Sequence, residues 1–211
     1  MTVDIDKELI IINDGSTDAT GDKVGNIVKK HSESTIKILS HPKNLGKGAA
    51  IRTGLKYATG DAIIIQDADL EYDPNDYYRL IEPILKGETE VVFGSRLKGM
   101  KLKLFGKDAT PLPSHYFANK FLSFLTNLLY GSNLTDMETC YKLLSKKVYS
   151  KLKLESNRFD IEPEITAKIL KAGFRIKEIP ITTKPRSYKE GKKIGWKDGL
   201  FAILTLMKYR L

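Results

Sequence analysis

The sequence predicts a single α/β domain built on a mostly parallel sheet that is sandwiched by helices. Short apolar segments rich in β-branched residues alternate with segments of helical periodicity, which is the pattern of βαβ units. The 211 residues are 41% hydrophobic and 29% charged, as expected of one soluble globular domain with a sizeable core. Polar clusters follow several of the apolar segments, and ligands of parallel sheets lie beyond the carboxyl ends of the strands.

The predicted strands are short, and most of the apolar segments lead into a polar turn. We expect strands over Glu8–Asn13, Ile36–Leu39, Asp61–Gln66, Glu90–Phe93, Cys140–Leu144 and Phe174–Thr182. We expect two helices that end near His31 and Ala58, and further helices over Pro74–Lys86, Pro113–Tyr130, Ile161–Lys171 and Trp196–Leu211. The helix after the third strand has a clear start, because Asp73 can cap it and Pro74 suits its first position.

Composition and charge limit the classes of partner. The net charge of +9 fits a phosphorylated ligand, a nucleic acid or an anionic membrane surface. A nucleic-acid partner is disfavoured, because the basic residues are grouped with acids and glycines rather than along one helix. Cys140 is the single cysteine, so we expect no internal disulfide, no cysteine metal cluster and a buried, inert thiol. We expect no signal peptide and no membrane-spanning helix, since no run of about 18 apolar residues occurs.

The strongest chemical signal is Asp67-Ala68-Asp69-Leu70-Glu71, where the third predicted strand ends. Side chains at alternate positions of extended backbone point broadly the same way, so we expect Asp67, Asp69 and Glu71 to gather. Crowded carboxylates repel one another unless a cation neutralises them. The pattern predicts a Mg²⁺ or Mn²⁺ site that holds a phosphorylated ligand. The alternative is a polar turn after a strand, since Asp-x-Asp also occurs by chance.

Four motifs, taken in order, resemble those of family 2 glycosyltransferases. They are Asn13-Asp14-Gly15-Ser16-Thr17-Asp18, Asn44-Leu45-Gly46-Lys47-Gly48, Gln66-Asp67-Ala68-Asp69-Leu70-Glu71 and Gly94-Ser95-Arg96. More narrowly, the chain is similar to the dolichyl-phosphate mannose synthases and their bacterial polyprenyl-phosphate glycosyltransferase relatives. This similarity extends through Thr135-Asp136-Met137-Glu138-Thr139-Cys140-Tyr141-Lys142, Arg158-Phe159, Glu162-Pro163-Glu164 and residues 186–196.

The resemblance implies a GT-A type fold, with the nucleotide held by the first two motifs. Asp14 would hydrogen-bond the nucleotide base. The loop of Asn44, Gly46, Lys47 and Gly48 would pack near the base and ribose, with its glycines allowing close backbone approach. Within that loop we expect Lys47 to be solvated rather than catalytic.

The resemblance also implies where the diphosphate and the chemistry lie. Asp67 and Asp69 would carry the metal, and Glu71 falls where relatives often have a glutamine that reaches it. Arg96 would contact phosphate. The expected catalytic residues are Asp69, Asp136 and Arg96, and Asp136 falls where relatives that act on sugar acceptors keep their base. With an acceptor that is already anionic, Asp136 would orient the acceptor or the sugar instead.

The acceptor side is expected in the second half of the chain. Arg186, Lys192 and Lys193 would grip the acceptor phosphate, within a basic loop at about residues 184–195. This loop either closes over the substrate or is simply solvated. His115 either reaches this site or is structural. The apolar positions of 117–130 and the amphipathic helix 196–211 are core or interface, or they touch a membrane surface.

The reaction that the resemblance implies is an inverting, metal-dependent transfer of a sugar to a polyprenyl or dolichyl phosphate. The donor would be a nucleotide-diphosphate sugar of the GDP-mannose or UDP-glucose type, and the cofactor Mg²⁺ or Mn²⁺. The enzyme would be cytoplasmic and peripheral to the cytoplasmic face of a membrane. The alternatives are an enzyme of the same family acting on a polysaccharide or soluble sugar, and an inactive relative that only binds nucleotide.

The chain departs from the family pattern at its start. Relatives begin with a strand and helix that carry a Pro-x-Tyr-Asn-Glu-like stretch, whereas here the Asn13 motif follows almost at once. A sheet without that strand has unpaired backbone groups and an exposed apolar edge. This favours self-association into a homo-oligomer and bears on activity.

Overall fold

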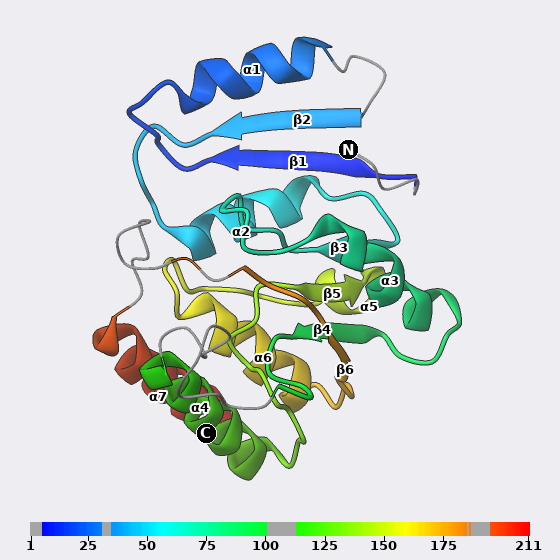
Figure 1. Cartoon of the computed structure of the whole chain (residues 1–211), viewed down its shortest axis with the longest axis vertical. Coiled ribbons are helices and arrows are strands. Elements are labelled where there is room, and N and C mark those ends of the chain that lie inside the picture. Colours follow the sequence, from blue (N-terminus) through cyan, green and yellow to red (C-terminus); the bar gives the residue numbers. More distant parts are fainter. Residues whose placement is uncertain (1–5, 31–34, 101–112, 185, 187–194) are drawn as a thin grey trace, which may run out of the picture.

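The computed structural model describes residues 6–30, 35–100, 113–184, 186 and 195–211, which form two sheets with helices around them (Figure 1). The smaller sheet pairs β1 (Glu8–Asn13) with β2 (Thr35–Ser40) in parallel. The larger sheet has the order β3 (Ala62–Ile64), β5 (Lys142–Ser145), β4 (Val91–Ser95), β6 (Lys177–Pro180).

Strand β5 runs against its neighbours. It is antiparallel to β3 and β4, whereas β4 and β6 are parallel, so β3, β4 and β6 share one direction. The mostly parallel sheet is confirmed, but the reversed strand was not predicted. The reversal follows from the preceding turn: Asp136 lies beside Arg96 at the end of β4, so the chain that leaves the turn runs back along β4.

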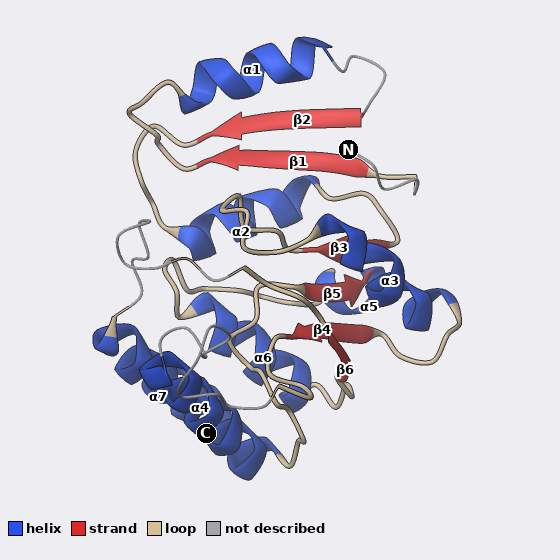
Figure 2. Ribbon diagram, in the orientation of Figure 1, coloured by secondary structure: helices blue, strands red, loops and turns tan. Residues whose placement is uncertain are grey.

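The larger sheet buries both faces with the strand period of two. Val91 and Phe93 pack on one face within a buried apolar cluster. Val92 packs on the opposite face with Leu80. The helices that cover these faces are α3 (Tyr77–Leu85) after the 3-10 turn η1 (Pro74–Asp76), α5 (Lys146–Tyr149) and α6 (Ile161–Lys171) (Figure 2).

The remaining helices extend the core beyond the sheets. They are α1 (Thr20–Lys30), α2 (Lys47–Tyr57), α4 (Pro113–Tyr130) and α7 (Trp196–Arg210). Helices α4, α6 and α7 form a separate layer around Leu122, Ala167 and Leu206. Helix α2 packs against β1, and its Ile51 and Leu55 reach the α6 side of the larger sheet.

The predicted elements are present, with shifted ends and one addition, α5. Asp73 caps the turn η1 as predicted, because its side chain accepts a hydrogen bond from Asn75 N at 2.9 Å. The last predicted strand begins late: Phe174 and Ile176 pack against the α6 cluster, and pairing begins only at β6.

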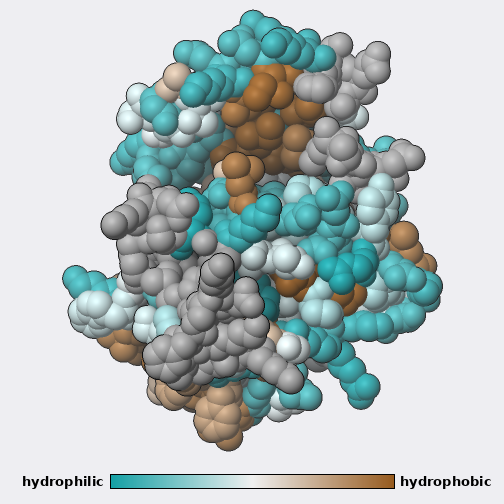
Figure 3. Space-filling view, in the orientation of Figure 1, coloured by the Kyte–Doolittle hydropathy of each residue, from teal (hydrophilic) through white to brown (hydrophobic). Residues whose placement is uncertain are grey.

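Strands β1 and β3 each have one open edge among the described residues. β1 pairs only with β2, and β3 only with β5. Every residue of β1 is only half-buried, and none belongs to the three buried apolar clusters. Figure 3 shows apolar colour over β1 and β2.

Among the described residues, every helix is too short or too polar to span a membrane.

Candidate active site

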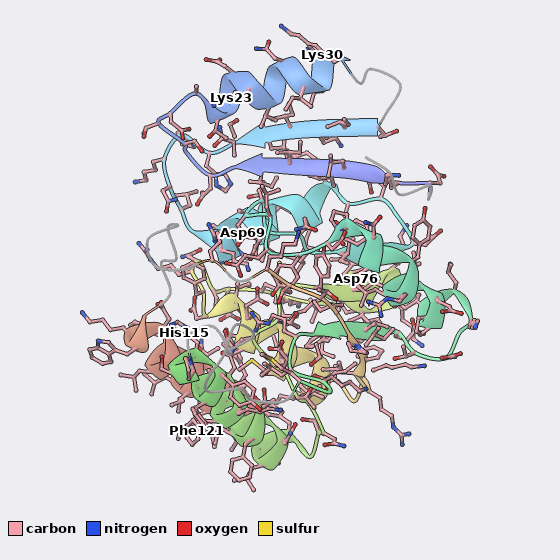
Figure 4. The ribbon with its side chains drawn as sticks, in the orientation of Figure 1. Lys23, Lys30, Asp69, Asp76, His115 and Phe121 are labelled. Carbon is pink, nitrogen blue, oxygen red and sulfur yellow. The ribbon has the colours of Figure 1, made fainter. Side chains whose placement is uncertain are left out.

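Carboxylates project from the loop after β3, and two of them converge on one guanidinium. Arg186 Nη2 lies 2.8 Å from Asp69 Oδ2, and Arg186 Nε lies 3.0 Å from Glu71 Oε1 (Asp69 is labelled in Figure 4). Leu70, between the two acids, has a φ of 60° and is 89% exposed. A leucine adopts this left-handed backbone only where its surroundings impose it, and the turn brings both acids to one cation.

Asp67 faces a different cation, Lys47 at the start of α2. Lys47 Nζ lies 2.7 Å from Asp67 Oδ2 and 2.8 Å from Glu162 Oε1. The expectation that Lys47 is solvated is therefore wrong, since its side chain is only 17% exposed. Burial acts to lower the pKa of Lys47, but the carboxylates of Glu162 and Asp67 raise it well above its ordinary value, so the lysine is charged.

Glu162, in the first turn of α6, links Lys47 to a second lysine. Lys142 of β5 is fully buried and donates to Glu162 and, at 3.0 Å, to the carbonyl of Met137. Burial acts to raise the pKa of Glu162, but the two lysines hold it below its ordinary value. In the sequence, Glu162 belongs to the motif Glu162-Pro163-Glu164, for which no function was predicted. Its position at a helix start was the available signal, because that end of a helix favours carboxylates.

The loop carboxylates suit a divalent metal in kind, because carboxylate oxygens are the ligands that Mg²⁺ and Mn²⁺ prefer. In the part of the chain that the structure describes, no three His, Cys, Asp or Glu side chains are arranged to hold such an ion. Instead, Lys47 pairs with Asp67, while Arg186 pairs with Asp69 and Glu71. The three acids were predicted to lie together, but in the structure Asp67 pairs with one cation, and Asp69 and Glu71 pair with another.

Arg96 and Asp136 form a buried two-point ion pair at the end of β4. Arg96 donates from Nε to Asp136 Oδ2 and from Nη2 to Asp136 Oδ1, each at 2.7 Å, and its backbone N donates to Oδ2 at 2.9 Å. The Asp136 side chain is 0% exposed, whereas that of Arg96 is 22% exposed. This geometry favours an orienting role for Asp136 over that of a base, because both of its oxygens already accept from Arg96.

Glu178 of β6 supports the turn that carries Asp136, and sequence reasoning missed it. Its carboxylate accepts from Thr135 N at 2.9 Å, from Thr135 Oγ1 at 2.8 Å and from Asp136 N at 3.0 Å. The available signal was an acid at an inward position of a predicted strand, since Glu178 is buried on β6. Buried carboxylates require such partners.

Glu138 is a second acid that sequence reasoning missed, and it interacts electrostatically with both the Lys142–Glu162 pair and the Arg96–Asp136 pair. Its pKa is raised to about 7, chiefly by burial, with Lys142 and Arg96 opposing that shift and Glu162 adding to it. Its Oε1 atom is buried and has no hydrogen-bond partner among the described residues. A carboxyl of this kind can hold or release a proton near neutral pH.

Asp14 organises the second motif. Its carboxylate accepts from Leu45 N at 2.9 Å and from Gly46 N at 2.8 Å, and it lies 2.7 Å from His41 Nδ1. Burial acts to raise the pKa of Asp14, but the hydrogen bonds from His41 and the two backbone amides lower it. Asn44 Nδ2 donates to the carbonyl of Asp14 at 3.3 Å. The first two motifs therefore form one unit.

The glycines of the second motif make room for a neighbouring loop of the protein. A Cβ on Gly46 would lie 2.3 Å from Asn157 O, and one on Gly48 would lie 2.3 Å from Ser156 O. Arg52 holds the same loop, donating to Ser156 O at 3.0 Å and to Asn157 Oδ1 at 2.7 Å. These glycines do allow a close backbone approach, as predicted. The segment that approaches them in the structure is residues 156–157 of the protein, whereas the prediction was the base and ribose of the nucleotide.

The other predicted residues are placed as follows. Cys140 is buried, its Sγ accepts from Asp67 N at 3.2 Å, and burial raises the pKa of its thiol, as expected of an inert cysteine. His115 lies at the start of α4, a different element from the loop of Asp69 (Figure 4). Lys192 and Lys193 lie outside the described residues, as does most of the basic loop.

A mostly parallel sheet with an acidic loop and two arginines beyond its strands is the arrangement expected of a GT-A type glycosyltransferase. The profile of the family described as Glycosyl transferase family 2 matches residues 4–153. The chain therefore belongs to glycosyl transferase family 2, as its motifs predict.

Known proteins resemble the chain over most of its length. The uncharacterized protein MJ1222 of Methanocaldococcus jannaschii is 30% identical over 97% of this chain and 82% of its own. Dolichyl-phosphate beta-glucosyltransferase ALG5A of Trichomonas vaginalis is 30% identical over 82% of this chain and 53% of its own, so the chain spans about half of that relative. The resemblance to lipid-phosphate glycosyltransferases is thus confirmed.

A solved structure confirms the fold. Glucosyl-3-phosphoglycerate synthase from Mycobacterium tuberculosis, crystallised with Mg²⁺ and uridine diphosphate, aligns with a TM-score of 0.66. The alignment covers 96% of this chain and 68% of that chain at 20% identity. At that identity the similarity concerns the fold alone.

Proposed function

We propose that this protein transfers a sugar, with inversion, from a nucleotide-diphosphate sugar of the GDP-mannose or UDP-glucose type to a polyprenyl or dolichyl phosphate. The observation that supports this most is the contact of Arg186 with Asp69 and Glu71, which puts a guanidinium suited to phosphate beside the expected metal-diphosphate site. The likeness to a dolichyl-phosphate glucosyltransferase supports the class of acceptor.

On the donor side, the acidic loop would hold Mg²⁺ or Mn²⁺ through Asp67, Asp69 and Glu71. When bound, this cation supplies positive charge that stabilises the departing nucleoside diphosphate. Arg96 would face the same phosphates, with Asp136 fixing the plane of its guanidinium. The loop that follows Asn44, shaped by the Asp14 carboxylate, would receive the base and ribose.

On the acceptor side, a lipid phosphate needs orientation more than a base. Its oxygen is anionic at pH 7 and can attack the anomeric carbon while the bond from that carbon to the diphosphate breaks. A sugar hydroxyl would need a base, and the expected one, Asp136, is engaged by Arg96 through both oxygens. This difference favours a phosphate acceptor, gripped by Arg186 together with Lys192, Lys193 and His115.

A lipid acceptor calls for contact with a membrane, and two packed helices offer a surface for it. Large apolar side chains that are at least half exposed line α4 and α7. We name this set the α4–α7 apolar surface: Phe117, Phe121, Phe124, Leu128, Trp196, Leu200, Phe201, Leu204 and Met207. Basic residues lie on the same helices, which suits an anionic cytoplasmic membrane face.

Replacement of Asp69 tests the proposal directly. Asp69→Ala is expected to lower transfer by at least about 100-fold, because a charge-stabilising group is lost from the leaving-group site. It should also abolish Mn²⁺-dependent thermal stabilisation by nucleotide sugars, measured over a panel of donors. Asp22→Ala, which removes an acid from the exposed helix α1, is the control and should behave as wild type. Full activity in Asp69→Ala would refute the proposal.

A second pair of variants separates the two acceptor classes. With a phosphate acceptor, Arg186→Ala should raise the acceptor KM by about tenfold or more, whereas Asp136→Asn should lower kcat without abolishing it. With a sugar acceptor the order reverses: Asp136 becomes indispensable and Arg186 dispensable. Steady-state kinetics with both kinds of acceptor distinguishes the outcomes.

A further inference from the structure

Arg186 contacts the acidic loop from a distant part of the chain. Its guanidinium bonds to residues that precede it by 115 and 117 positions, Glu71 and Asp69. The pKa of Arg186 is raised above its ordinary value, first by the hydrogen bond to Glu71 and then by the nearby acids Asp69, Glu71 and Asp67. All three acids of the loop thus act on this one side chain.

A divalent ion and this guanidinium cannot use the same oxygens together. A bound divalent ion would use carboxylate oxygens of this loop, such as Asp69 Oδ2 and Glu71 Oε1, as its ligands. In the structure, Arg186 nitrogens lie 2.8 and 3.0 Å from these atoms, so the oxygens that would bind an ion already accept from the guanidinium. Two cations so close together would also repel each other.

Lys47 and Arg186, the two cations that pair with acids of the loop, differ in how firmly they are held. The Lys47 side chain is 17% exposed and bonds to both Asp67 and the buried Glu162, so it is fixed in place. The Arg186 side chain is 35% exposed, and its described partners are Asp69 and Glu71 alone. Half-exposed ion pairs are weak, so Arg186 is the cation that a metal would displace.

We propose that Arg186 is a built-in counter-cation that competes with the divalent metal for Asp69 and Glu71 and is released by the metal to bind the acceptor phosphate. This rests on the proposed function and adds an order of binding to it. Donor and metal bind first, and their arrival frees Arg186. The acceptor phosphate then replaces the carboxylates as the two-point partner of the guanidinium.

The test is a Mn²⁺ titration of the whole chain without nucleotide, in which free Mn²⁺ is followed by electron paramagnetic resonance at fixed ionic strength. Arg186→Gln is expected to tighten Mn²⁺ binding roughly tenfold, because two half-exposed ion pairs no longer compete. Arg186→Lys, which keeps the charge but not the fork of two nitrogens, should fall between. Lys177→Gln removes one cation from an exposed pair with Glu88 and should match wild type.

A second measurement follows the acceptor side with a short-chain prenyl phosphate as the probe. Wild type should bind it more tightly with Mn²⁺ present than without, and Arg186→Gln should bind it weakly in both cases. Equal or weaker Mn²⁺ binding by Arg186→Gln than by wild type would overturn this inference and leave the proposed function standing. Absence of Mn²⁺ binding in both proteins would overturn both.

Discussion

Glu138 is an acid whose ionisation the fold opposes. Its pKa is raised from 4.5 to about 7, chiefly by burial. Below about pH 4.5 its carboxyl is protonated in the folded and the unfolded chain, and between about pH 4.5 and 7 only the folded chain keeps the proton. Above that window both states are ionised and the folded chain buries a charge. The contribution of Glu138 to the free energy of unfolding therefore falls as pH rises from about 4.5 to 7.

Replacing Glu138 by glutamine removes that penalty where it is largest. Glu138→Gln is expected to raise the free energy of unfolding at pH 8 by up to about 3 kcal/mol, and to change it little at pH 5. Urea unfolding at both pH values measures the difference. Glu82→Gln, at an exposed site on α3, is the control. An equal gain at both pH values would trace the effect to packing and contradict the ionisation argument.

At the residue scale, the sequence shows which polar groups lie at the edge of the sheet but not what they pair with. Asp67, Asp69 and Arg96 follow strands, so their location was predictable. The roles of Glu162 and Glu178 depend on contacts with residues far away in sequence. Sequence periodicity carries no information on such distant partners. Lys47 was wrongly predicted to be solvated for the same reason, because its partners Asp67 and Glu162 are far away in sequence.

At the element scale, the start of α2 is held by a close contact with residues 156–157. A Cβ at position 48 would lie 2.3 Å from Ser156 O, a backbone atom that a rotamer change cannot move. Gly48→Ala is therefore expected to lower the free energy of unfolding by about 1–3 kcal/mol, the usual cost of overpacking. It should also weaken nucleotide-sugar binding, because the same helix start carries Lys47 and the loop that Asp14 shapes. Thermal unfolding and donor titration measure the two effects.

Gly54 in the same helix is the matched control. The nearest atom to a Cβ there is Ile12 Cγ1 at 3.7 Å, an ordinary contact. Gly54→Ala is expected to raise the free energy of unfolding by about 0.5–1 kcal/mol, since alanine is the better helix former. If Gly48→Ala were as well tolerated as Gly54→Ala, the junction with residues 156–157 would not constrain the site.

Element types were predictable because β-branched runs, caps and helical periodicity are local signals. The direction of β5 was not, since the same apolar segment can pair in either direction and the turn at Asp136 decides it. Helix α5 is too short to show a period, and it follows β5 without a break. Local patterns thus specify the elements, while the turns between them specify the sheet.

At the scale of the whole molecule, two of the described regions leave apolar side chains incompletely buried. One is the half-buried β1, whose edge has no strand beside it among the described residues. The other is the α4–α7 apolar surface, at the opposite end of the molecule in Figure 1. A monomer rarely exposes large apolar areas without a use for them. The side chains of β1 are half-buried, whereas those of the α4–α7 apolar surface are at least half exposed, so the second region is the better candidate for a partner surface.

Vesicle binding tests the proposed use of the α4–α7 apolar surface. Phe121 and Phe124 are 55% and 62% exposed, so replacing both by aspartate leaves the core intact. The double variant is expected to partition into phosphatidylglycerol vesicles at least about tenfold less than wild type, because it removes two apolar anchors and adds charge. Leu85→Asp on α3, at a site 76% exposed, is the control and should bind as wild type. Cosedimentation measures both.

The same variants decide between a membrane and a second copy of the chain. If the surface binds lipid, added salt or neutral lipid should weaken binding in part, since the basic residues of α4 and α7 act by charge and the aromatic side chains do not. Sedimentation without lipid should then give the same mass for wild type and the double variant. A wild-type dimer that the double variant converts to a monomer, with vesicle binding unchanged, would assign the surface to self-association instead.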